Sequence, residues 1–180
     1  VLSSALGVSL KDKTALVNHF EVTGTTTHAV NETWKPVLGE QAQIVNHYNE
    51  LIVALVQKDS KVKLNLVFRA FDEGVAFRYD FPKQENLNYF IISDEKTEFN
   101  LTENNKVFWI PGDFDSNEYV YNETKFSEID NEKLNLNNGI GVKSIPGKYT
   151  VQTPLQMKSP SGLYLNRSEE RRVGKECLIT

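Results

Sequence analysis

The chain has 180 residues, of which 39% are apolar and 11% aromatic, and its 20 Lys and Arg against 24 Asp and Glu give a formal net charge of −4. This length and apolar content suffice for the core of one globular domain, and no run approaches the roughly 20 apolar residues that a membrane span requires. A mildly acidic chain without clustered cations also gives no electrostatic reason to bind nucleic acid or an anionic membrane.

Residues 32–50 form the most distinctive stretch of the chain, E-T-W-K-P-V-L-G-E-Q-A-Q-I-V-N-H-Y-N-E. The ring of Trp34 and the polar groups of Glu40, His47 and Asn49 suit sugar recognition, because pyranose C–H faces stack on rings while hydroxyls need hydrogen-bond partners. We therefore predict these four residues as candidates for a ligand pocket, and it is a family resemblance of this chain that implies a sugar as the ligand. The alternative for Trp34 is a core position, since a buried Trp removes a large apolar area from water.

Two kinds of sugar chemistry are open to this stretch. Glycoside hydrolysis requires two carboxyl groups on either side of the scissile bond, and Glu32, Glu40 and Glu50 qualify only if two of them converge. Otherwise they are solvated side chains, and we assign no catalytic residue. A sugar epimerase of the mutarotase kind instead uses a His and a carboxylate for proton transfer, for which His47 beside Glu50 is the candidate. The plainer interpretation of His47 is a hydrogen-bonded structural role.

The segments that follow predict antiparallel strands. Residues 49–57 are apolar on both faces, as in a strand central to a packed sandwich. Residues 62–70 and 75–81 alternate apolar and polar side chains, and Asp72-Glu73-Gly74 joins them, which predicts a hairpin of two half-buried strands.

Shorter strands are predicted along the rest of the chain, over 89–92, 97–101, 106–110, 118–122, 155–158 and 163–165. Polar, Asn-rich residues 130–148 predict a loop that contains one weak strand. We expect no helix longer than about two turns and no internal repeat. Many short strands with regular turns predict an all-β fold, an antiparallel β-sandwich.

Asp113, Asp115 and Asn117 have the D-x-D-x-N opening of a calcium loop. An EF-hand is excluded because Glu118 and Thr124 stand where that loop needs Gly and Glu. Asp113 and Asp115 are either solvated loop acids or part of the lining of the sugar pocket. The three histidines have no metal-ligand spacing, so we assign no metal site in this chain.

Residues 167–180 differ in character from the rest and hold the only cysteine, Cys177. Seven of the eleven residues 167–177 are charged and show no strand or helix period. The string R-S-E-E-R-R-V-G-K-E-C resembles a translated sequencing-library adapter. We therefore expect residues 1–166 to be one partial domain and residues 167–180 to be a foreign, disordered tail.

Three segments, in chain order, resemble the N-terminal domain of glycoside hydrolase family 97. They are W-K-P-V-L-G-E (34–40), L-N-L-V-F-R-A-F-D-E-G-V-A-F-R-Y-D-F (64–81) and W-I-P-G-D-F-D-S (109–116), with Leu38 where the family usually has an aromatic. The resemblance implies a galactose-mutarotase-like super-sandwich, incomplete in this chain, that packs against a catalytic barrel outside it and helps to shape the sugar pocket.

The same resemblance implies that the full-length parent hydrolyses α-linked glucosides or galactosides and binds calcium, whereas the isolated chain is inactive. No calcium ligand is assignable in this chain, because the Glu that the family supplies from this domain falls in the expected tail. The expected partner is an oligosaccharide together with the missing barrel, and the expected location is periplasmic or secreted. A stand-alone carbohydrate-binding module and a mutarotase-like sugar epimerase are the competing classes.

Overall fold

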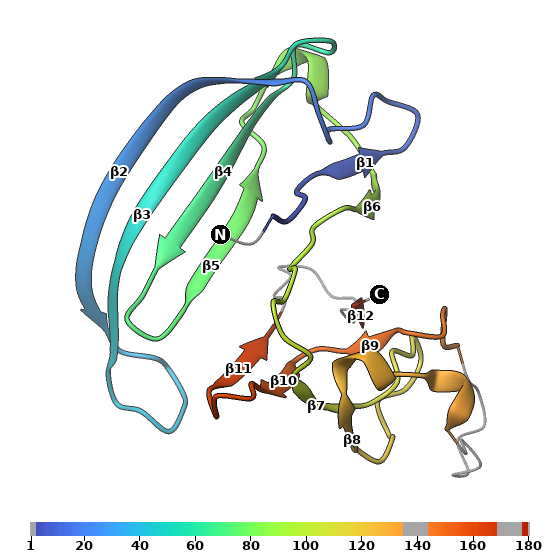
Figure 1. The fold of residues 1–180 in the computed structure, drawn as a ribbon. Coiled ribbons are helices and arrows are strands. Elements are labelled where there is room, and N and C mark those ends of the chain that lie inside the picture. The colour runs from blue at the N-terminus through green and yellow to red at the C-terminus, as the bar shows by residue number, and fades with distance from the viewer. Residues whose placement is uncertain (1–2, 135–143, 169–177, 180) are drawn as a thin grey trace. The chain divides into compact units, whose positions relative to one another are not determined.

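The structure, a computed structural model, describes residues 3–134, 144–168 and 178–179. The chain divides into two compact units, Ser3–Phe99 and Asn100–Thr180 (Figure 1), each of which is built from antiparallel strands. Helices in the described residues are three single 3-10 turns, η1 (Glu85–Leu87), η2 (Phe126–Glu128) and η3 (Asn131–Lys133). The predicted all-β antiparallel fold is confirmed, and it is consistent with a β-sandwich. Within these residues no helix has the length and apolarity needed to cross a bilayer.

The first unit is organised around one four-stranded antiparallel sheet. Its strands, in order across the sheet, are β2 (Phe20–Trp34), β3 (Ile44–Gln57), β4 (Lys63–Ala70) and β5 (Val75–Asp80). They run side by side as a long curved layer in Figure 1. A second antiparallel pair consists of β1 (Val8–Leu10) and β6 (Ile92–Glu95). Strand β2 forms one edge of the large sheet, whereas β3 is paired on both sides.

The hairpin predicted over 62–70 and 75–81 is confirmed as β4 and β5. The predicted strand 49–57 is the second part of β3, which begins earlier, at Ile44. Strand β2 is absent from the prediction, because its sequence lacks an apolar alternation. Its Thr and Val residues are β-branched and favour extended backbone, and pairing with β3 along its length completes the strand.

The core of the first unit lies where β2 begins and β3 ends. A cluster of buried apolar side chains comprises Val8, Leu10, Leu16, Val62 and Leu87. Partly buried aromatic side chains pack against it, namely Phe20, Tyr79, Phe81 and Phe90. Burial of this apolar surface stabilises one end of the sheet. The opposite end of β3 is more exposed, and β2 is exposed along almost its whole length, so side chains there are available for other contacts.

The second unit contains a smaller antiparallel sheet. Its strands, in order, are β11 (Tyr164–Arg167), β10 (Leu155–Lys158), β7 (Lys106–Trp109) and β8 (Asn122–Lys125), and a further pair joins β9 (Val151–Gln152) to β12 (Leu178–Ile179). One face of the sheet covers a separate core of Val107, Trp109, Ile129, Val151, Leu155 and Met157. The fully buried Trp109 ring donates through Nε1 to Thr124 Oγ1 at 3.0 Å, which satisfies its one polar group.

Several short strands differ from their predicted positions. The predictions over 155–158 and 106–110 are confirmed as β10 and β7, and the prediction over 163–165 is confirmed as β11 with a shift. The strands predicted over 89–92 and 118–122 overlap β6 and β8 at one residue each, and 97–101 forms no strand. One physical reason is that backbone groups of these segments bond to a distant part of the chain outside the named strands. Glu98 N, for example, donates to the carbonyl oxygen of Ala5 at 2.8 Å, outside any named strand.

Parts of two further predictions lie outside the described residues. Residues 135–143 fall within the predicted loop 130–148, and residues 169–177 make up most of the predicted tail. Strand β11 ends at Arg167, the first residue of that tail, and Arg167 is opposite Leu155 of β10. The foreign origin of the tail and the domain boundary at 166 stay predictions.

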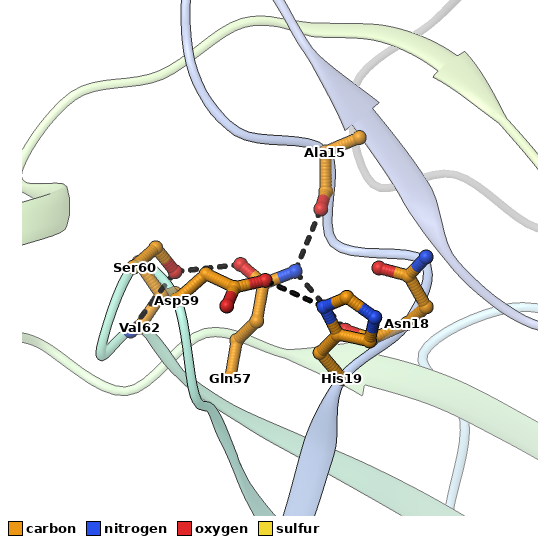
Figure 2. A network of polar contacts seen from close by, with 7 residues as sticks. All are labelled: Ala15, Asn18, His19, Gln57, Asp59, Ser60 and Val62. Atoms are coloured by element: carbon orange, nitrogen blue, oxygen red, sulfur yellow. Dashed lines mark hydrogen bonds and ion pairs between the residues drawn. The ribbon is translucent and has the colours of Figure 1, made fainter.

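A buried glutamine fixes the loops at the core end of the first sheet (Figure 2). Gln57, the last residue of β3, has a fully buried side chain. Its Nε2 donates to the carbonyl oxygens of Ala15 (2.8 Å) and Asn18 (3.1 Å), and its Oε1 accepts from Ser60 Oγ (2.6 Å). Both amide hydrogens and the carbonyl oxygen are therefore bonded, so the side chain joins the segment before β2 to the turn after β3.

We expect Gln57→Leu to lower the free energy of unfolding of the first unit by about 2–4 kcal/mol, because two carbonyl groups and the Ser60 hydroxyl then lose their partner. Gln41→Leu, at an exposed loop position, is the matched control and should change it by less than about 0.5 kcal/mol. Urea denaturation followed by circular dichroism measures both variants. Equal stability of the two would contradict the structural role of Gln57.

Candidate functional site

Four of the predicted site residues lie at the exposed end of β2 and β3, but they do not share one surface. Trp34 ends β2, Glu40 is exposed in the connecting loop, and His47 and Asn49 are exposed in β3. The register places His47 opposite Asn31, three residues before Trp34. Because opposite residues share a face and successive residues alternate, Trp34 lies on one face of the sheet while His47 and Asn49 lie on the other.

Polar side chains accompany Trp34 on its side of the sheet, which we call the Trp34 face. The register assigns to it Glu32 and Trp34 of β2, Asn46, Tyr48 and Glu50 of β3, and Arg69 of β4. Asn46 Nδ2 donates to Glu32 Oε1 at 2.6 Å, directly across the two strands. The half-exposed Trp34 ring thus has a carboxylate and an amide beside it on the same face.

Glu50 on this face is held by an ion pair. Arg69 Nε donates to Glu50 Oε2 at 2.7 Å, and the guanidinium carbon lies 4.4 Å from the centre of the Tyr48 ring. Tyr48 is buried, and its ring lies 5.2 Å from that of Phe71. The Glu50 side chain is only 12% exposed, so its charge depends on Arg69 for compensation. Glu50 is thus a structural anchor of the sheet rather than a free acid.

The histidine and carboxylate considered for an epimerase do not meet. His47 and Glu50 are three residues apart in β3 and therefore point to opposite faces of the sheet. The histidine that does lie beside a carboxylate is His19, for which no partner was predicted. Its Nδ1 lies 2.7 Å from Asp59 Oδ2 (Figure 2), and both side chains are more than half exposed.

Three apolar side chains at the end of the β2–β3 hairpin are exposed, namely Trp34, Val37 and Leu38. We call these three residues the hairpin-end patch. Trp34 is 49% exposed, and Val37 and Leu38 are 98% and 89% exposed. Trp34 is therefore not the buried core residue considered as its alternative role. Clustered apolar side chains with this exposure are typical of contact surfaces.

The predicted residues Asp113 and Asp115 lie in the second unit. Asp113 is fully buried, and its carboxylate accepts hydrogen bonds from Tyr119 Oη (2.5 Å), Asp115 N (2.8 Å), Ser116 N (3.2 Å) and Ser144 N (3.2 Å). Ser144 Oγ lies within hydrogen-bond distance of the carboxylates of both Asp113 and Asp115. Asp115 itself is exposed. Asp113 is therefore not a solvated loop acid: it ties residues 115–119 to the segment around Ser144.

These hydrogen bonds also determine how Asp113 and Tyr119 ionise. Burial by itself raises the pKa of Asp113, but the donors from Tyr119, Asp115 and Ser144 together outweigh it and hold that pKa at about 2. Burial and the adjacent Asp113 carboxylate raise the pKa of Tyr119 to about 12. Asp113 is thus an anion with both oxygens occupied, so neither a sugar hydroxyl nor a metal ion can bind it without displacing a protein donor.

No calcium site is assigned in the described part of the chain. It contains no group of three or more His, Cys, Asp or Glu side chains able to hold a metal ion. Asp113, which opens the calcium-like D-x-D-x-N string, has its oxygens occupied by protein donors. Calcium therefore stays a proposal for the full-length parent, and no chemistry of this chain is derived from it.

Comparison with known protein families identifies the class to which the chain belongs. Residues 1–174 match the family model described as Glycosyl-hydrolase 97 N-terminal. This match covers almost the whole sequence, so the chain belongs to the glycosyl-hydrolase 97 N-terminal family.

Solved structures agree with that membership. A Glycoside Hydrolase Family 97 enzyme from Pseudoalteromonas sp. strain K8, in complex with acarbose, is 27% identical in sequence to this chain, with a TM-score of 0.70. The aligned region covers 98% of this chain and 26% of the enzyme. A variant of that enzyme in complex with panose gives a TM-score of 0.69 at the same identity. A beta-arabinopyranosidase at 19% identity and a TM-score of 0.71 shows the fold alone. The chain thus spans about a quarter of the length of the enzymes it matches.

The Asp113 anion stabilises the second unit only while it is deprotonated. Its pKa falls from an ordinary 3.8 to about 2 on folding, a difference worth about 2 kcal/mol that is fully present above about pH 4 and lost as pH falls through about 2. We expect Asp113→Asn to be less stable than the native chain at neutral pH and to lose less stability on acidification.

Denaturation by urea at about pH 6, 3 and 2 measures this difference in pH dependence. Glu118→Gln removes an exposed carboxylate from the same loop and should keep the native profile. An Asp113→Asn profile parallel to that of the native chain would show that Asp113 does not carry this pH dependence.

Proposed function

We propose that this chain serves as the N-terminal domain of a family 97 type glycoside hydrolase and packs on a catalytic barrel formed by the rest of the parent polypeptide. One observation carries the proposal: the family model matches residues 1–174, and the solved family 97 enzymes align with 98% of this chain while it covers only 26% of theirs. In this role the domain supports catalysis, and the isolated chain hydrolyses nothing.

The exposed end of the β2–β3 hairpin suits a part in shaping the sugar pocket of the parent. The Trp34 ring offers a flat apolar surface, and the Glu32–Asn46 pair beside it offers hydrogen-bonding groups on the same face. Sugars require this combination, since their C–H faces stack on rings and their hydroxyls need partners. Val37 and Leu38, which are almost fully exposed, suit contact with the barrel.

The proposed substrates of the parent are α-linked glucosides or galactosides. The Pseudoalteromonas relative was solved with panose and with acarbose, which supports an oligosaccharide substrate. Hydrolysis needs two carboxyl groups across the scissile bond. Glu50 is committed to Arg69 and Asp113 to its own loop, so we assign the reacting acids to the barrel. We further propose that the full-length parent binds calcium and is periplasmic or secreted.

The role of the hairpin is tested in the full-length parent by Trp34→Ala. We expect kcat/KM for panose to fall roughly fivefold, because one stacking surface worth about 1 kcal/mol is lost. Val75→Ala, which removes an exposed apolar side chain from β5, is the control and should leave kcat/KM unchanged. Thermal unfolding of both variants shows whether either substitution destabilises the fold.

Two results would contradict the proposal. Unchanged kcat/KM in a folded Trp34→Ala parent would exclude a part for the hairpin in the sugar pocket. Hydrolysis of an aryl α-glucoside by the isolated chain would exclude the assignment of the reacting acids to the barrel.

A further inference from the structure

The second sheet carries a row of neutral side chains on the face opposite its core. Val107 and Met157 are buried, so their neighbours Phe108 and Gln156 point to the other face. The register places Gln156 opposite Phe108 of β7 on one side and opposite Asn166 of β11 on the other. Phe108, Gln156 and Asn166 therefore form one continuous row across three strands.

A hollow of about 440 Å³ opens on this row. Its lining consists of Phe108, Tyr121, Pro154, Gln156 and Asn166. This volume lies in the range of small-molecule sites. Tyr121 is 65% exposed and Gln156 and Asn166 are exposed, so the hollow is accessible to solvent.

The lining combines aromatic rings with uncommitted amides. In the part of the chain that the structure describes, the side-chain amides of Gln156 and Asn166 and the hydroxyl of Tyr121 make no hydrogen bond, in contrast to the saturated amide of Gln57. Each amide both donates and accepts, as a sugar hydroxyl does. Phe108 and Tyr121 supply ring surfaces for stacking against C–H groups.

The charge around the hollow favours a neutral ligand. None of the five lining residues is an Asp, Glu, Lys, Arg or His. Two lysines on the same face already have partners: Lys106 pairs with Glu123, and Lys158 Nζ lies 4.9 Å from the centre of the Tyr164 ring. An anionic ligand would find no free cation in the lining, so a neutral polyhydroxylated molecule fits best.

We propose that this hollow is a carbohydrate-binding subsite for a neutral oligosaccharide. It lies wholly within the second unit and involves none of the residues of the Trp34 face. The inference does not depend on the catalytic barrel, so it holds for the isolated chain, and its failure would leave the proposed function intact.

The test is a titration of the isotopically labelled 180-residue chain with panose, followed by amide chemical shifts. We expect saturable shifts confined to β7, β10, β11 and the residues around Tyr121, with weak affinity typical of a shallow site. Tyr121→Ala should weaken panose binding roughly three- to tenfold through loss of one stacking ring, and Gln156→Ala by a similar factor through loss of its hydrogen bonds.

Tyr149→Ala is the matched control, because Tyr149 is an equally exposed aromatic of the same unit outside the lining, and it should leave the affinity unchanged. Both substituted side chains are exposed, and dispersed amide spectra verify that the variants are folded. Absence of shifts up to about 20 mM panose would overturn the subsite, as would binding that Tyr121→Ala and Gln156→Ala leave intact. Shifts centred on Trp34 would likewise assign sugar binding elsewhere.

Discussion

The structure of the first unit depends on the register of β3 against the strands on either side of it. Successive side chains of a strand point to opposite faces, so a slip of one residue would exchange every side chain between the two faces. The observed register groups Trp34, Glu32 and Asn46 on one face, together with the Glu50–Arg69 pair. It places His47 on the other face, away from Glu50. Which residues can act together is therefore decided by register rather than by proximity in sequence.

Buried polar groups hold the loops of both units through hydrogen bonds. Gln57 uses its whole amide to join two loops of the first unit, and Asp113 uses both carboxylate oxygens to tie together two segments of the second. Polar groups this thoroughly bonded stabilise a fold but cannot bind a substrate. The polar groups that solvent can reach include the Glu32–Asn46 pair of the Trp34 face and the side-chain amides of Gln156 and Asn166. This distribution of polar groups supports the proposal that the domain assists a catalytic barrel in the parent polypeptide.

Sequence reasoning predicted the all-β fold, the β4–β5 hairpin and the family, because alternation and motif strings are local properties. It missed β2, whose Thr-rich sequence becomes a long strand only through pairing with β3. It grouped Trp34 with His47, since their faces depend on register. It could not predict the burial of Asp113 or the row of Phe108, Gln156 and Asn166, because these depend on partners from distant segments such as Ser144.

The most direct test of the central claim is a measurement of side-chain proximities between β2 and β3 by nuclear Overhauser effects in the labelled chain. The observed register predicts contacts of the Trp34 ring with Ile44, and of Glu32 with Asn46. Contacts of the Trp34 ring with Val45 in place of Ile44, or of Glu32 with His47 in place of Asn46, would show a register slipped by one residue and would contradict the separation of the two faces.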